Sequence, residues 1–138
     1  MKNLVCTITG MVGAAFASAF GGWSGFLTTL LICMAIDYAT GMIVAGVFHN
    51  SPKSETGALE SNAGLKGIFR KGMMLLFVLV GHRFDLAIGT TYIRDAVCIA
   101  FIVNEVLSMT ENAGLMGVPV PEVITNAIDV LKKKQENK

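Results

Sequence analysis

Long apolar runs separated by short polar breaks dominate the chain. Two runs with at most one charged residue cover about residues 3–20 and 24–48, and two further runs cover about 67–89 and 93–110. Each is close to the roughly 20 residues that an α-helix needs to cross the hydrocarbon core of a bilayer. We therefore predict an all-α membrane protein with four transmembrane helices, which together form a multi-span domain over residues 1–120.

The end of the chain, residues 121–138, follows a different pattern. Charged residues surround a narrow apolar stripe at helical spacing, which predicts an amphipathic helix that lies on the membrane surface or packs against a neighbour. The apolar stripe consists of Ile124, Ala127, Ile128 and Leu131. The last seven residues, KKKQENK, are predicted to be solvated and disordered.

The polar break at 49–71 is predicted to be a loop, with at most a helical turn near 55–62.

Composition supports the membrane interpretation and excludes several classes of protein. Hydrophobic residues make up 53% of the chain and charged residues only 15%, whereas soluble domains carry about 25% charged residues. The net charge of +1 provides no field that would attract nucleic acid. The three cysteines and two histidines lie far apart in sequence, so we expect no metal and no cofactor.

The positive charges predict the orientation. Lysine and arginine are concentrated at Lys2, in the break at 50–71 and in the tail at 132–138. With four spans all three groups lie on one side, which the positive-inside rule makes cytoplasmic. Both termini are then cytoplasmic. A three-span alternative would place these basic groups on opposite sides of the membrane. Lys66, Arg70 and Lys71 are interpreted as a cluster that flanks the membrane.

Several polar side chains fall inside the predicted spans. An ionised carboxylate at the centre of a bilayer costs about 2.5–3.5 kcal/mol or more, so Asp37 and Glu105 are expected to face protein or water. Structural hydrogen bonds would explain them as well as a pore would, and His82 with Asp85 could form an internal ion pair. The candidates for a pore lining or a polar subunit interface are Asp37, Thr40, His82, Arg83, Asp85, Arg94, Asp95, Glu105, Ser108 and Asn112.

Small residues recur at a spacing of four in the first span. Such ridges let helix backbones approach closely in lipid, although a span that is simply rich in alanine and glycine explains them equally well. A signal peptide, with Ala17-Ser18-Ala19 as its cleavage site, is the rival interpretation of this segment. We interpret it as a membrane helix. The predicted helix-packing residues are Gly10, Gly13, Ala14, Ala17, Ser18, Gly21 and Gly41.

Three runs of residues carry a family resemblance. They are D-Y-x-T-G at 37–41, S-x-x-G-x-K-G-x-x-R-K at 61–71 and N-E-x-x-S-x-x-E-N-A-x-x-x-G-V-P-V-P at 104–121. In these runs the chain resembles the toxin secretion/phage lysis holin family of Gram-positive phages and prophages, over most of its length. The run at 104–121 is long and specific, and the other two support it. His82-Arg83-Phe84-Asp85 fits the family more loosely.

The resemblance implies a protein of the host cytoplasmic membrane that forms homo-oligomeric lesions at a set time. These lesions would release an endolysin, without direct contact to it, or a large toxin. The resemblance implies no catalysis. A translation start at Met11 would remove Lys2 and shorten the first span, which could give an inhibitory form, an antiholin.

Two other functions remain open from the residues. A small ion channel or transporter could use Asp37, Asp85 and Glu105 as a proton or cation relay. A non-conducting membrane scaffold would need the polar faces to be purely structural. Enzyme classes lack support, since the sequence offers no nucleophile, metal or phosphate-binding motif in a suitable context.

Overall fold

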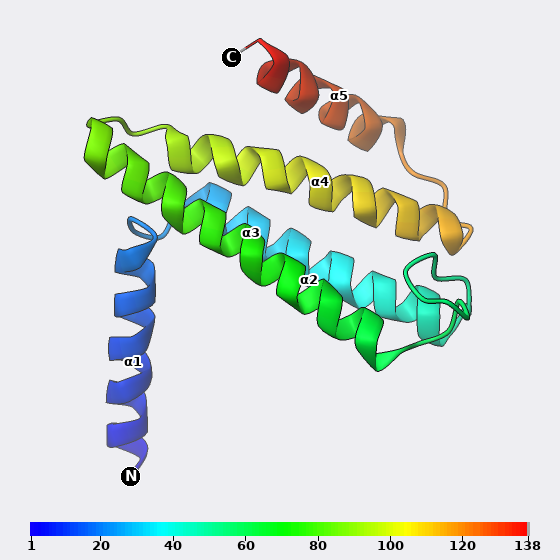
Figure 1. Ribbon diagram of the computed structural model, residues 1–138, viewed down its shortest axis with the longest axis horizontal. Helices are drawn as coiled ribbons and strands as arrows, with labels where there is room; N and C mark the ends of the chain where they lie inside the picture. The colour runs from blue at the N-terminus through cyan, green and yellow to red at the C-terminus, as the bar shows by residue number, and fades with distance from the viewer. Residues whose placement is uncertain (138) are drawn as a thin grey trace.

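The structure is a computed structural model that describes residues 1–137, and these residues form helices and no strand. The all-α prediction is confirmed. Figure 1 shows five helices in chain order. Their bounds are Lys2–Ala19 (α1), Gly25–Gly46 (α2), Ser61–Ile88 (α3), Ile93–Leu115 (α4) and Glu122–Glu136 (α5).

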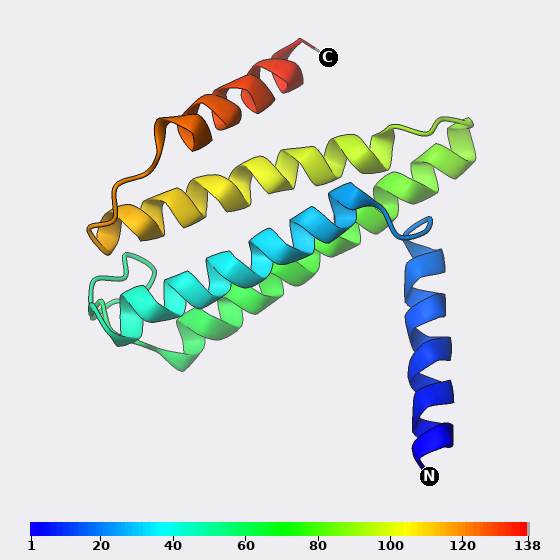
Figure 2. The same cartoon turned by 180° about the vertical axis from the view of Figure 1, so that it is seen from behind.

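Helices α2, α3 and α4 form a bundle in which α4 packs along both of the others (Figures 1 and 2). Direct contact between α2 and α3 is sparse, so α4 holds the bundle together. The core is apolar and combines residues from all three helices with Phe20 from the turn before α2. Its fully buried members include Leu27, Leu30, Val78 and Cys98.

Helix α1 stands apart from the bundle and points away from it in both views (Figures 1 and 2). None of its residues is buried. A side chain added at Gly10 or Gly13 would meet nothing within 4 Å, so the predicted small-residue ridges pack against no other helix of this chain. Packing of α1 against lipid or a second copy stays a prediction.

Two element boundaries differ from the sequence prediction. Helix α3 already begins at Ser61, because the loop-forming Pro52 and Gly57 lie before it and the residues after Glu60 are compatible with a helix. There is no helical turn at 55–60. The tail prediction was also wrong, since α5 continues to Glu136. Lysine and glutamine favour helices, and lysines in the last turn complement the helix dipole.

Among the described residues, one helix, α2, is both long enough and apolar enough to cross a membrane. Helices α3 and α4 are longer than α2, but they carry more charged residues. The prediction of four spans is therefore not confirmed by length and composition. Where the charged side chains of α3 and α4 point decides whether these helices are compatible with a bilayer.

At Gly81 the helices α3 and α4 approach each other closely. It is buried, and a Cβ atom there would lie 3.2 Å from the Cα of Arg94 and 3.3 Å from a methyl group of Val97. We expect Gly81→Val to lower the stability of the bundle by about 1–3 kcal/mol, because overpacking forces the two backbones apart. Thermal unfolding of the detergent-purified protein, followed by circular dichroism, measures this effect.

Gly72 supplies the matched control, because it lies in the same helix with open space around it. Gly72→Val should leave the unfolding temperature close to that of the unmodified protein. Equal losses in both variants would contradict a close α3–α4 contact at Gly81.

Candidate functional site: two buried polar clusters

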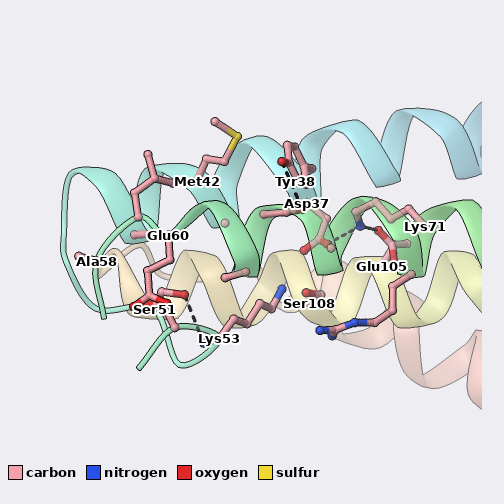
Figure 3. Close-up of a pocket in the computed structure, with 18 of the residues that line it drawn as sticks. Asp37, Tyr38, Met42, Ser51, Lys53, Ala58, Glu60, Lys71, Glu105 and Ser108 are labelled. Carbon is pink, nitrogen blue, oxygen red and sulfur yellow. Dashed lines mark hydrogen bonds and ion pairs between the residues drawn. The ribbon is translucent and has the colours of Figure 1, made fainter. Parts of the chain in front are cut away.

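The first polar cluster joins three helices through one lysine. The Nζ of Lys71, on α3, lies 2.6 Å from Oδ2 of Asp37 on α2 and 2.5 Å from Oε2 of Glu105 on α4. Figure 3 shows the three side chains converging. The side chains of Asp37 and Glu105 are only 5% and 7% exposed. A single ammonium group therefore bridges two buried carboxylates.

Asn112 completes this cluster from one end of α4. Its amide nitrogen donates to the main-chain oxygen of Asp37 at 3.3 Å, to Oδ1 of Asp37 at 3.2 Å and to Oγ1 of Thr40 at 2.9 Å. Asn112 is 4% exposed, so these bonds form away from water. Hydrogen bonds of this kind are needed to offset the desolvation of a buried carboxylate.

The positions of the charged residues in their helices explain why they meet. Asp37 and Glu105 each lie about ten residues before the C-terminal end of their helices, and Lys71 lies about ten residues after the start of α3. All three ends lie at the same end of the bundle (Figure 1). At 1.5 Å per residue, the cluster lies about 15 Å inside that end, near the middle of the bundle.

Formal charges in this cluster do not balance, because two carboxylates share one ammonium group. Separating a buried pair by removing one partner typically costs about 3–5 kcal/mol, far more than an exposed ion pair contributes. The cluster therefore holds α2, α3 and α4 in one register, and it would be strongly perturbed by the loss of Lys71.

The second cluster lies at the opposite end of the bundle, at the turn between α3 and α4. The Asp85 carboxylate accepts hydrogen bonds from Oγ1 of Thr90 at 2.6 Å and from the backbone N–H groups of Ile93 and Arg94 at 2.9 and 3.0 Å. Asp85 thereby satisfies the free N–H groups that begin α4. The predicted ion pair between His82 and Asp85 is wrong, since Asp85 caps the next helix instead.

Arg94 ties the turn between α1 and α2 to this second cluster. Its Nη1 donates to the main-chain oxygens of Phe20 at 2.7 Å and Gly22 at 3.1 Å. Its Nη2 lies 3.2 Å from Oδ1 of Asp95. Arg94 therefore joins its neighbour Asp95 to a loop more than 70 residues earlier in the chain.

The remaining predicted residues include one that lies outside both clusters. His82 lies directly against Gly21, which has a positive φ of 81°. Arg83 is exposed, and the groups that donate to Asp85 belong to Thr90, Ile93 and Arg94. Gly41 faces Asn112, whose Nδ2 would lie 3.8 Å from an added Cβ, so its predicted packing role fits the structure.

A cavity of about 210 Å³ opens next to the first cluster. Ser108 lines it together with Asp37 and Glu105, while Lys53 reaches toward them from the loop between α2 and α3 (Figure 3). Ser108 therefore lies beside the charged cluster, as its position on the helical face of Glu105 predicts. The cavity can hold water or a small polar group next to buried charge.

Sequence reasoning missed the role of Lys71. The pattern placed Lys71 at a membrane interface, yet its side chain is 16% exposed and binds both carboxylates. One sequence feature could have identified this role. Asp37 and Glu105 lie inside apolar runs and need a cation, and Lys71 lies at the start of a neighbouring apolar run. An aliphatic stem lets lysine reach a buried partner from such a position.

These features define a helical protein with two buried clusters of charged and polar side chains inside a bundle that exposes many large apolar side chains. Residues 14–133 match the bacteriophage holin family. The chain therefore belongs to the bacteriophage holin family, and holins are membrane proteins. The family resemblance seen in the sequence is confirmed.

Individual relatives agree with this assignment. A probable holin of Bacillus phage phi105 is 31% identical over 114 residues, which cover 82% of this chain and 78% of the relative. An uncharacterised protein of Halalkalibacterium halodurans is 37% identical and covers 96% of each chain. An uncharacterised 14.9 kDa protein of Clostridium perfringens is 35% identical over 98% of this chain and 100% of its own length. No solved structure matches the chain.

Lys71→Met tests the importance of the shared cation. We expect a loss of about 3–5 kcal/mol in the free energy of unfolding, because the variant leaves two carboxylates buried without a cation. Denaturant unfolding in detergent micelles measures it. Lys66→Met is the matched control, since Lys66 is exposed on the same helix and should change stability by no more than about 0.5 kcal/mol.

The triple variant Asp37→Asn, Lys71→Met, Glu105→Gln separates charge imbalance from general damage. Replacing all three charged groups removes the unpaired carboxylates, so the triple variant should recover much of the stability lost in Lys71→Met. A triple variant that is less stable than the single variant would contradict the role of Lys71 as a neutralising partner.

Proposed function

We propose that this chain is a holin that accumulates in the host cytoplasmic membrane and assembles into homo-oligomeric lesions at a set time. The lesions let an endolysin, or a large toxin, pass out of the cytoplasm without binding the holin. The observation that carries the proposal is the Asp37–Lys71–Glu105 cluster, buried in a bundle that belongs to the holin family. The proposed protein is not an enzyme.

The proposed topology has four spans with both termini in the cytoplasm. At 1.5 Å per residue, α1, α2 and α4 measure about 27, 33 and 35 Å, close to the roughly 30 Å of a bilayer core. Helix α3 is longer and can tilt. The inward pairing of Asp37, Lys71 and Glu105 supports this topology, because it removes the most expensive charges from lipid.

Helix α5 needs a separate place in this topology. In the structure it runs back beside α4, with Ile128 buried (Figure 1). Its lysines at 132–134 and its acidic residues would be costly in hydrocarbon. We propose that α5 swings away from α4 and lies on the cytoplasmic surface once the bundle is inserted, as its amphipathic pattern predicts.

The clusters suggest how a closed chain becomes part of a lesion. In a single chain, α2, α3 and α4 direct their carboxylates, lysine and amide toward one another. When copies gather, the same polar faces could pair between chains or line a water-filled opening, so the charges would never meet lipid. Lesion formation would then require the Asp37–Lys71–Glu105 cluster to rearrange. An antiholin form of the chain would act by blocking this assembly.

The alternative, an ion channel or transporter with a carboxylate relay, has less support. Asp85 lies 14 residues beyond Lys71 on α3, about 21 Å along the helix axis. Its carboxylate is fully engaged in capping α4. Between the two clusters lie the apolar core residues Leu30 and Val78. A relay through Asp37, Glu105 and Asp85 would have to cross this layer.

Expression of the chain without an endolysin should stop growth and depolarise the membrane abruptly after a delay. The physical reason is that lesions open only when enough copies have gathered. A potential-sensitive dye, read during induced expression in a Gram-positive host, measures it. Co-expression of an endolysin should then cause lysis. Continued growth with an intact potential, at verified membrane expression, would refute the holin proposal.

Glu105→Gln should shift the time of depolarisation, because it removes one of the two charges that Lys71 bridges while preserving the side-chain shape. We expect a change of several minutes or more at equal expression. Glu111→Gln is the matched control, since Glu111 is exposed on the same helix and forms no ion pair within residues 1–137. Equal timing in both variants would leave Glu105 with a structural role only.

A further inference from the structure

Helices α2 and α3 leave a groove between them near the loop at 47–60. Tyr38 bridges the groove, with its hydroxyl donating to the main-chain oxygen of Gly64 at 3.5 Å and its ring lying against Gly67. The cavity of about 210 Å³ beside the charged cluster and a second one of about 310 Å³ both adjoin Tyr38. They share Met42, Leu59 and Gly64 as well, so the two cavities lie next to each other.

The first cavity has an acidic floor whose charges are already engaged. Asp37 and Glu105 bind Lys71, and Asp37 also accepts from Asn112. Glu60, at the rim, accepts from the hydroxyl of Thr56 at 2.9 Å. Each of these carboxylates therefore already accepts at least one bond from within the chain.

Two further cations line the same cavity. Lys53 and Arg70 line it, both are exposed, and neither makes an ion pair within the described part of the chain. Figure 3 shows Lys53 extending from the loop over the cavity. Two cations without a bound partner favour a ligand with a negative charge, and a phosphate group accepts hydrogen bonds from both side-chain types.

The lining of the second cavity is mostly apolar, with Glu60 and Ser61 as its charged and polar members. Met42 and Leu59 line it together with Leu65 and Ile68, and all four are more than 40% exposed. A free phosphate ion would leave these side chains uncovered. A ligand that joins a phosphate to acyl chains would instead fit both parts of the groove. Basic pockets between transmembrane helices on the cytoplasmic side bind anionic lipid headgroups in this way.

We propose that the α2–α3 groove binds one anionic phospholipid of the cytoplasmic leaflet. Lys53 and Arg70 hold the phosphate, and the acyl chains lie along Met42, Leu65 and Ile68. This inference rests on the proposed topology, which places this end of the bundle at the cytoplasmic surface. A zwitterionic lipid is disfavoured, since its own cationic group would have to lie near Lys53 and Arg70. Bound lipid would hold the 47–60 loop against the first cluster.

The test is native mass spectrometry of the full chain in detergent, with phosphatidylglycerol and phosphatidylcholine of identical acyl chains. We expect preferential retention of one phosphatidylglycerol. Lys53→Gln with Arg70→Gln should weaken it by about fivefold for each cation, roughly 25-fold together. Lys66→Gln is the matched control, because Lys66 is an exposed cation one helical turn from Arg70 that lines neither cavity. It should have little effect.

Three outcomes would overturn the lipid site. They are equal retention of both lipids, an equal loss in the Lys66→Gln control, and complete displacement of the lipid by millimolar inorganic phosphate, which would indicate a site for a free anion. Circular dichroism confirms that each variant is folded.

The dye assay in cells separates this inference from the proposed function. Selective lipid retention by a chain that never depolarises cells would support the lipid site and refute the holin proposal. Depolarisation by a chain that retains no lipid selectively would support the holin proposal and refute the lipid site.

Discussion

The bundle depends on one ammonium group placed between two carboxylates. Within the described residues, Lys71 is the only charged side chain of α3 that forms ion pairs with both α2 and α4. Because α2 and α3 otherwise touch little, this ion pairing and the apolar packing on α4 together set their separation. The groove beside Tyr38 lies next to this ion-pair cluster, between α2 and α3, which make few direct contacts with each other. Lys71 thus joins the three helices and also lines the cavity between α2 and α3.

Periodicity predicted the helices well because each apolar run is long. Residues 24–48 and 93–110 correspond closely to α2 and α4. The boundaries failed where polar residues are still good helix formers, at Ser61 before α3 and at 132–136 in α5. Such residues form helix without an apolar pattern, so hydrophobic spacing alone does not predict that a helix extends over them.

The candidate site was predicted in part. Helical spacing placed Asp37 with Thr40 on one face of α2 and Glu105 with Asn112 on one face of α4, and in the structure these four residues share one cluster. Their role as a pore lining or subunit interface stays a prediction. What spacing could not predict is the partner of each group. Asp85 is three residues from His82, yet the chain reverses after it and brings backbone N–H groups within reach. The hydrogen-bond partners of Asp85 depend on the geometry of the α3–α4 turn, which the spacing of hydrophobic residues does not describe.

Arg94 recognises main-chain oxygens of the α1–α2 turn, and this has an evolutionary consequence. A guanidinium that binds carbonyl groups is indifferent to most side chains at those positions, provided that the turn keeps its backbone path. Helix α1 can therefore diverge in sequence, length or lipid preference while its attachment point stays fixed. Related chains could retune this first helix for different host membranes without rebuilding the three-helix bundle.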